Sequence, residues 1–133
     1  MIRKILVGYD GTESSARAFD YAVDLAQRHG AQVEMLGVLN LSAGGGSAVA
    51  SKVQMEQWQR HFQKQSRMLP GIVLSCRVAA GRPGAEIVAR AQAGGFDLIV
   101  LGYRHRSGFW RWLAHSTVNT AIGNAHCPVL IVQ

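Results

Sequence analysis

The sequence lacks several features that would place it in a specialised class of protein. It has only two cysteines, Cys76 and Cys127, which lie far apart and without CxxC spacing. Neither a disulfide framework nor a zinc site is therefore indicated. No apolar run approaches the roughly 20 residues of a membrane-spanning helix, and the N-terminus does not read as a signal peptide. We expect a cytoplasmic protein with no membrane partner.

Signatures of common nucleotide sites and of catalysis are also missing. There is no GxxxxGK[ST] motif and no GxGxxG motif after a strand. Asp10 stands alone in its loop, whereas Glu86 and Asp97 suit a helix start and a strand entry. Ser107, His115 and Asp10 could be assembled into a triad, but a chain with five histidines offers such sets by chance. We expect binding rather than turnover.

Acidic residues are scarce in the second half of the chain. The net charge is +6, from 14 Lys and Arg against 8 Asp and Glu. Residues 1–66 contribute +1 (seven basic, six acidic), and residues 67–133 contribute +5 (seven basic, two acidic). No acidic residue follows Asp97. This surplus favours either an anionic ligand near the C-terminal half or simple solubility, and the sequence leaves both open.

What is present is a regular alternation of apolar runs and helical patterns. A hydrophobic content of 48% over 133 residues fits one globular domain. The patterns predict strands at 4–9, 32–39, 72–79, 97–102 and 129–132, and helices at 12–30, 53–68, 83–93 and about 116–124. This alternation predicts an α/β fold, a single-domain open five-stranded parallel sheet with helices on both faces. The two most apolar strands should be central and adjacent, which gives the strand order 3-2-1-4-5.

One stretch interrupts this alternation. Residues 42–51 are rich in Gly, Ser and Ala around Gly44-Gly45-Gly46, and we expect them to form a mobile loop. The domain itself should extend over residues 1–133.

The strand order places a candidate ligand site at the switch point between the first and fourth strands, outside their carboxyl ends. The first strand is followed there by Asp10, Gly11 and Thr12, and the fourth by Gly102, Arg104, His105, Ser107 and Gly108. His115, Ser116 and Thr117 are expected to open the next helix. Free backbone N–H groups at a helix start, near hydroxyls and arginines, suit a phosphate group. The alternative is that Ser116 is simply an N-cap and the arginines are solvated.

A set of short motifs is spread over the whole chain. It consists of Lys4-Ile5-Leu6-Val7, Asp10-Gly11-Thr12, Ser15, Gly81, Pro83, Ile87, Ala91, Asp97-Leu98-Ile99-Val100-Leu101-Gly102, Arg104, Arg106-Ser107-Gly108, Ser116 and Cys127-Pro128-Val129. In these residues the sequence resembles the universal stress protein family. The resemblance implies a five-stranded parallel sheet of the adenine-nucleotide α-hydrolase-like type, in agreement with the strand order above.

The chain departs from the family's nucleotide loop at two positions. Members that bind nucleotide carry Gly-x-x-Gly, followed after nine residues by Gly-Ser or Gly-Thr. Gly102 matches the first glycine and Ser116 the hydroxyl, but His105 and His115 replace the other two glycines. A side chain at such positions disfavours a positive φ and fills space next to the ligand.

The resemblance therefore allows two interpretations. In one, Asp10 contacts the ribose or a phosphate-bound cation, the backbone of Val38 holds adenine, and Gly102, Ser116 and Thr117 hold the phosphates of ATP or AMP with Mg²⁺. In the other, the two histidines fill the triphosphate space, and the protein acts as a dimer in stress signalling without retaining ATP. In the first interpretation, protonated His105 and His115 would add donors for the phosphates. We favour the second interpretation for ATP, and leave a mononucleotide or small anion open. The resemblance implies slow ATP hydrolysis as the upper limit of any activity, and that activity would need the phosphate contacts that this sequence has altered.

Two further segments suggest contacts with partners. Residues 109–113 interleave aromatic and basic side chains, which suits single-stranded nucleic acid, but their helical spacing favours packing instead. We expect Trp110 to contact a protein partner or cover the pocket rather than bind nucleic acid. The last strand, Val129, Leu130, Ile131 and Val132, lies at a sheet edge, and the resemblance implies a homodimer through it.

Overall fold

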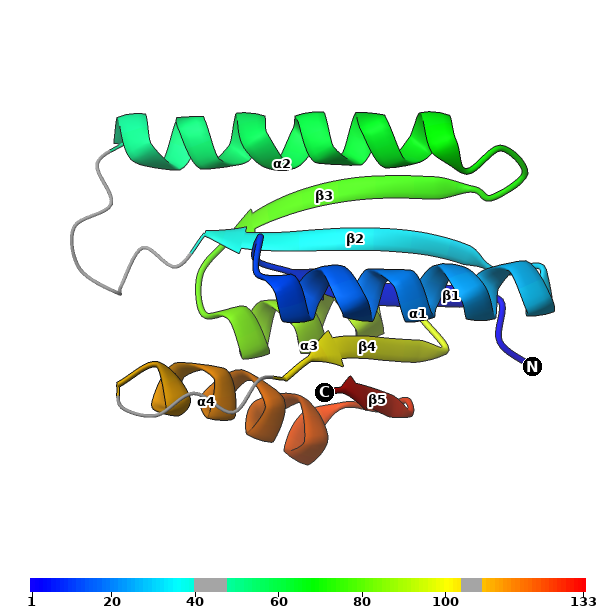
Figure 1. The fold of residues 1–133 in the computed structure, drawn as a ribbon. Helices are drawn as coiled ribbons and strands as arrows, with labels where there is room; N and C mark the ends of the chain where they lie inside the picture. Colours follow the sequence, from blue (N-terminus) through cyan, green and yellow to red (C-terminus); the bar gives the residue numbers. More distant parts are fainter. Residues whose placement is uncertain (40–47, 104–108) are drawn as a thin grey trace.

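The computed structural model describes the backbone of residues 1–39, 48–103 and 109–133, and the side chains of these except 48–51 and 109–116. Strands and helices alternate along the chain (Figure 1). The elements are β1 (Lys4–Tyr9), α1 (Glu13–His29), β2 (Gln32–Leu39), α2 (Ala48–Met68), β3 (Leu74–Ala80), α3 (Pro83–Ala93), β4 (Leu98–Gly102), α4 (Phe109–Asn124) and β5 (Val129–Val132). All five strands pair in parallel in the order β3-β2-β1-β4-β5, which confirms the predicted fold class and strand order.

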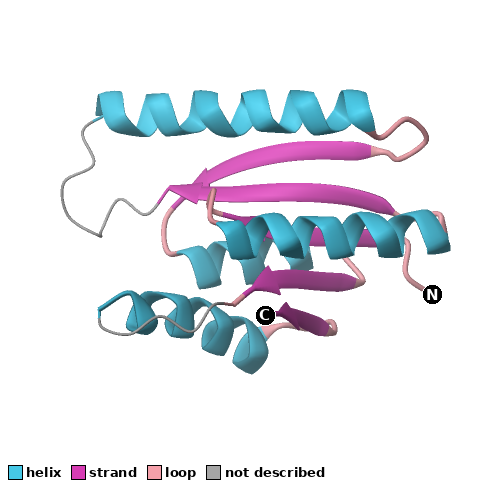
Figure 2. Cartoon of the chain, in the orientation of Figure 1, coloured by secondary structure: helices cyan, strands magenta, loops and turns pink. Residues whose placement is uncertain are grey.

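Helices cover both faces of this sheet (Figure 2). α1 and α2 pack on the face that carries Ile5 and Val7, and α3 and α4 pack on the face that carries Leu6 and Ile99. Because both faces of β1 are covered, its consecutive residues Ile5, Leu6 and Val7 are all fully buried, and this explains the uninterrupted apolar run in the sequence. No helix in the described part of the chain is long and apolar enough to cross a membrane.

The two ends of α1 have the caps that the sequence predicts. Thr12 is the N-cap, and its Oγ1 accepts a hydrogen bond from the backbone N–H of Ser15 at 3.3 Å. Gly30 is the C-cap in the left-handed region at φ 66°, and its N–H donates to the carbonyl of Ala26. These caps fix where α1 begins, directly after the carboxyl end of β1.

Two helices begin earlier than predicted. α2 starts at Ala48 instead of 53, so the end of the predicted mobile loop at 42–51 is helical, and the rest of it falls mainly outside the described residues. α4 starts at Phe109 instead of about 116. The reason in the second case is that residues 109–115 contain no Gly or Pro to interrupt a helix, so a hydroxyl at Ser116 was mistaken for a cap.

Asp97 joins the entries of the two central strands. Its Oδ2 accepts hydrogen bonds from the backbone N–H groups of Arg3 at 2.8 Å and Lys4 at 2.9 Å. These two bonds hold the pKa of Asp97 below its usual value. Asp97 is therefore a strand-entry residue, as the sequence indicated.

A single carboxylate is buried in the middle of the sheet. Glu34 of β2 is 8% exposed, and Arg90 of α3 binds it with two hydrogen bonds, Nε to Oε1 at 2.7 Å and Nη2 to Oε2 at 2.8 Å. Arg77 lies 3.5 Å from the same carboxylate. Burial acts to raise the pKa of Glu34, but the hydrogen bonds from Arg90 and the positive charges of Arg90, Arg77 and Lys4 together lower it. The ion pair thus ties α3 to the centre of the sheet.

We expect Glu34→Gln to lower the free energy of unfolding at pH 7 by about 2 kcal/mol, because Arg90 loses its charged partner in a largely buried place. Since the pKa of Glu34 is lowered by folding, its ionised form adds stability above the unfolded pKa, and this is lost as the pH falls through the folded pKa. Urea unfolding should therefore show a smaller difference between the two proteins at pH 3.5 than at pH 7. The exposed Glu56→Gln is the control, and an equal loss at both pH values would contradict the prediction.

Candidate functional site

The carboxyl ends of β1 and β4 lie side by side, as the predicted switch point requires. The first turn of α1 packs against the last residue of β4 at very short range. A β-carbon on Gly102 would lie 2.2 Å from the carbonyl oxygen of Ser14 and 2.8 Å from the nitrogen of Ser15. Gly102 does not have a positive φ. Its lack of a side chain is explained by this helix contact, whereas the sequence analysis connected it only with phosphate.

Hydrogen bonds fix the orientation of the Asp10 side chain, directly after the carboxyl end of β1. Its Oδ1 accepts hydrogen bonds from the backbone N–H of Thr12 at 3.0 Å and from Thr12 Oγ1 at 2.5 Å. Gly11 between them has φ +82°, a conformation that favours glycine. Within the described residues, no donor binds the second carboxylate oxygen, Oδ2. Asp10 is exposed, so this oxygen can accept a hydrogen bond from a ligand.

Val38 and Thr117 are the other predicted site residues whose side chains are described. Gly37 pairs with Tyr9 across β1 and β2, so Val38 lies level with Asp10 at the same edge of the sheet. Its side chain packs on the α3 and α4 face. Thr117 is partly exposed and lies well inside α4.

The remaining predicted site lies largely outside what the structure describes. Arg104, His105, Ser107 and Gly108 fall outside the described residues, and the side chains of Trp110, His115 and Ser116 are not described. The backbone of α4 still corrects one expectation. Because α4 begins at Phe109, residues 115–117 do not open the helix, and their N–H groups are in register for bonds within it.

Trp58 is the residue at this edge that sequence reasoning missed. It comes from α2, is 5% exposed, and lies flat over Gly37, where a β-carbon would come within 2.3 Å of its Cε3. The nitrogen edge of the indole reaches the loop between β1 and α1, because Nε1 lies 3.5 Å from the position of a β-carbon on Gly11. One turn further along α2, His61 stacks on Tyr9 with 5.1 Å between ring centroids. The sequence offers one signal for this contact, because Gly37 interrupts the apolar run of β2, but the glycine does not indicate that Trp58 is the residue that packs on it.

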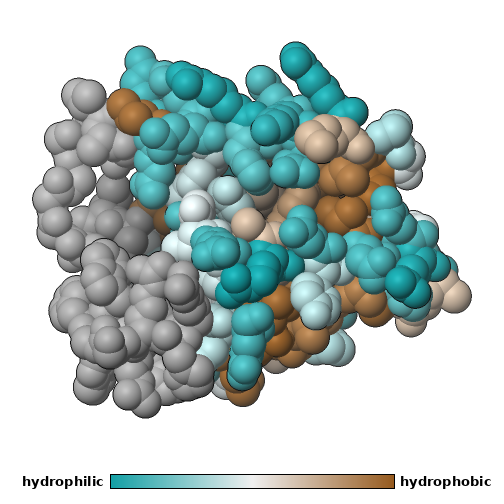
Figure 3. Space-filling model, viewed as in Figure 1, coloured by the Kyte–Doolittle hydropathy of each residue, from teal (hydrophilic) through white to brown (hydrophobic). Residues whose placement is uncertain are grey.

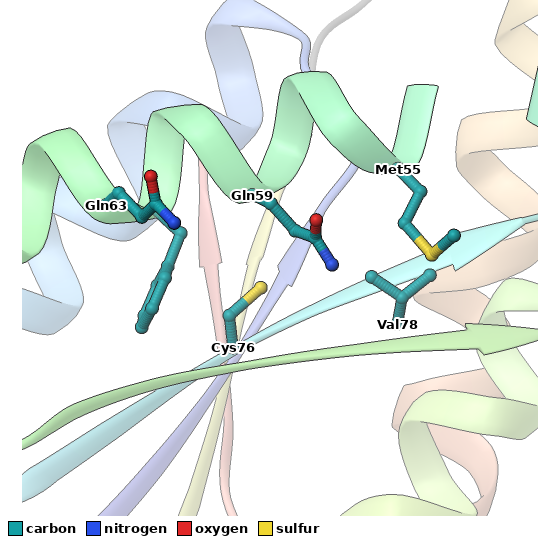
Figure 4. Close-up of a pocket in the computed structure, with 6 residues that line it drawn as sticks. Met55, Gln59, Gln63, Cys76 and Val78 are labelled. Atoms are coloured by element: carbon teal, nitrogen blue, oxygen red, sulfur yellow. The ribbon is translucent and has the colours of Figure 1, made fainter. Parts of the chain in front are cut away.

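A cleft between α2 and β3 lies away from the switch point (Figure 4). Its volume is about 570 Å³, and its lining consists of Met55, Gln59, Phe62, Gln63, Cys76 and Val78. Burial, and after it the negative charge of Glu34, raises the pKa of the Cys76 thiol. None of the predicted site residues lines this cleft. Among the residues that the structure describes, no three His, Cys, Asp or Glu side chains come together as a metal site.

Comparison with known proteins identifies the family. A family model described as the universal stress protein family matches residues 1–133. The chain belongs to the universal stress protein family. A universal stress protein of Methanocaldococcus jannaschii is 31% identical over 100% of this chain and 83% of its own length. Among solved structures, the universal stress protein UspA from Lactobacillus plantarum has a TM-score of 0.81 at 28% identity and covers 99% of this chain and 98% of its own.

Two more distant members of the universal stress protein fold were solved with adenine nucleotides. One is a universal stress protein in complex with cAMP, with a TM-score of 0.76, 23% identity and coverage of 99% of this chain and 97% of its own. The other is a family protein from Arabidopsis thaliana with AMP bound, with a TM-score of 0.69, 16% identity and coverage of 98% and 90%. At these identities the likeness shows a shared fold.

The contact at Gly102 can be tested directly in this universal stress protein. We expect Gly102→Ala to lower the free energy of unfolding by about 2–3 kcal/mol, because the added methyl group meets the backbone of Ser14 and Ser15. Gly123→Ala is the matched control, since a β-carbon there meets nothing within 4 Å and should be neutral or stabilise α4 by a few tenths of a kcal/mol, roughly. Urea unfolding measures both. If Gly102→Ala were as well tolerated as Gly123→Ala, the packing explanation would be wrong.

Proposed function

We propose that this universal stress protein works by binding and association rather than by turnover. It binds an adenine mononucleotide at the switch point, outside the carboxyl ends of β1 and β4, and it binds ATP weakly or not at all. It forms a dimer with a second copy through β5. The observation that carries the ligand proposal is the orientation of Asp10. Its Oδ1 accepts hydrogen bonds from Thr12, and no donor among the described residues binds its Oδ2, which we assign to the ligand.

The arrangement of the switch point suits the nucleoside part of such a ligand. Asp10 and Val38 lie level at the edge of the sheet, so a carboxylate acceptor for a ribose hydroxyl stands next to backbone groups for a base. Ligands of open α/β sheets bind at this place. The proteins solved with AMP and with cAMP share the fold, and both of their ligands carry a single phosphate.

The limit to one phosphate comes from the loop after β4 and from α4. His105 and His115 stand where nucleotide-binding members have glycine. The start of α4 at Phe109 also removes the free N–H groups that Ser116 and Thr117 were expected to offer. The basic surplus after Asp97 still favours an anion, so one phosphate fits these residues better than three. Mg²⁺ would accompany a nucleotide phosphate in this proposal.

Isothermal titration calorimetry with AMP and ATP, with and without Mg²⁺, tests the ligand. We expect AMP to bind at least about tenfold more tightly than ATP, and Asp10→Asn to weaken AMP binding by about tenfold, because a charge-assisted hydrogen bond is lost. The double variant His105→Gly and His115→Gly should gain affinity for ATP, because both rings are removed. Micromolar binding of ATP by the unaltered protein, lost in the double variant, would favour the alternative of an ATP switch in which the histidines hold phosphates.

The proposal for association is based on β5. It pairs only with β4, and the N–H groups of Ile99 and Tyr103 donate to the carbonyls of Pro128 and Val132. The backbone N–H and C=O groups of alternate residues of β5 therefore point toward β4, and those of Val129 and Ile131 point to the outer edge of the sheet. The side chains of Val129, Leu130 and Ile131 are partly exposed, and Figure 3 shows apolar residues where β5 ends the sheet. An unpaired apolar edge suits antiparallel pairing with a two-fold mate.

Sedimentation equilibrium at tens of micromolar tests the dimer. We expect the unaltered chain to have twice its monomer mass of 14.4 kDa. Ile131→Lys should give a monomer, because it places a like charge on each of the two edges that would pair. Val53→Lys, which adds the same charge at an exposed position of α2, is the control and should stay dimeric. A monomeric unaltered chain would contradict the proposal.

A further inference from the structure

The indole of Trp58 combines deep burial with an unused hydrogen-bond donor. The side chain is 5% exposed, and its benzo ring is fixed over Gly37. Within residues 1–39, 48–103 and 109–133, nothing accepts a hydrogen bond from its Nε1. A buried tryptophan normally places its N–H on an acceptor, so this donor needs an explanation.

Nε1 of Trp58 lies beside the loop that follows β1. It lies 3.5 Å from the place that a β-carbon would take on Gly11, the residue that follows Asp10. Asp10 offers an acceptor through Oδ2, and Trp58 offers a donor from a different element. A donor thus lies beside Gly11, and the residue before Gly11 carries an acceptor. Since Gly11 has no side chain, nothing of its own covers the indole N–H.

The chemistry of this pair selects the kind of group that can bind. A phosphate oxygen would accept from the indole, but the carboxylate of Asp10 would repel it. A hydroxyl can do both at once, because it donates to a carboxylate and accepts from an N–H. We infer that Trp58 is a ligand-binding residue of this site, whose Nε1–H donates to a ribose hydroxyl that itself donates to Asp10. This inference rests on the proposed function, and it adds selection for ribonucleotides over nucleotides without ribose hydroxyls.

Two glycines, Gly37 and Gly11, leave the space that the indole of Trp58 occupies. Any side chain at Gly37 would displace the indole, and one at Gly11 would contact its nitrogen. The ring is therefore placed by packing before a ligand arrives, and a preorganised donor loses little freedom on binding. Substitution of the ring should change the selectivity of binding more than the overall fold.

The first measurement follows the indole N–H signals of the ¹⁵N-labelled protein by NMR. The chain has three tryptophans, so the signal that is missing in Trp58→Phe assigns Trp58. Saturation with AMP should shift this proton downfield, and saturation with 2′,3′-dideoxyadenosine monophosphate should not. An unmoved signal at saturating AMP would overturn the inference. The assigned signal in the unaltered protein keeps the test valid even if the variant folds poorly, since Trp110→Phe and Trp112→Phe assign the other two.

The second measurement compares affinities. Trp58→Phe should weaken AMP binding five- to tenfold, roughly the loss of one hydrogen bond, and leave the affinity for the dideoxy analogue within about twofold. Phe96→Leu, a buried change beside Lys4 and Arg90, is the control and should leave both affinities unchanged. If Trp58→Phe weakened the binding of both ligands equally, Trp58 would have only a packing role and the inference would be wrong, while the proposed function would stand. Failure of AMP to bind the unaltered protein at millimolar concentration would instead overturn the proposed function, and the inference with it.

Discussion

The contact between the backbone of Ser14 and Gly102 is the constraint on which the candidate site depends. It brings the first turn of α1 onto the end of β4, although α1 follows β1 in the sequence. Since the first turn of α1 packs on the carboxyl end of β4, the loop from Asp10 to Thr12 lies next to the point where the chain leaves β4. A larger residue at position 102 would push the helix away and open this edge. The shape of the candidate site therefore depends on close packing between two backbone segments.

Much of this architecture could be predicted from the sequence, because it depends on local patterns. Continuous apolar runs identify strands buried on both faces, and Thr12 and Gly30 mark the ends of α1 by their own hydrogen-bonding and conformational preferences. The start of α4 was wrong, because a hydroxyl at Ser116 resembles a cap even when the helix continues through it. Asp10 and Val38 lie level with each other at the sheet edge where the sequence predicts a site, and their part in binding stays a prediction. Trp58 was not predicted as a member, since its contact with Gly37 joins residues from separate elements and no local pattern encodes such a contact.

α2 has a larger part in this edge than its composition suggests. Its sequence is rich in Gln, Lys and Arg and reads as a surface helix, and Figure 3 shows hydrophilic residues over it. The side facing the sheet nevertheless carries Trp58 and His61, which lie against Gly37 and Tyr9 near the ends of β2 and β1. α2 thus places two aromatic side chains at this edge of the sheet, although it is separate in sequence from β1, α1 and β4. Changes in α2 would reach the switch point through these two rings.

The two cysteines show how charge can protect a thiol that the fold leaves partly open. Cys76 and Cys127 are both free and both partly exposed. Burial raises the pKa of each, and a carboxylate adds to the effect, Glu34 for Cys76 and Asp97 for Cys127. Because oxidants and electrophiles react with the thiolate, both sulfurs are slow nucleophiles at neutral pH. Burial first, and the charges of Glu34 and Asp97 after it, therefore favour the protonated and less reactive form of both thiols.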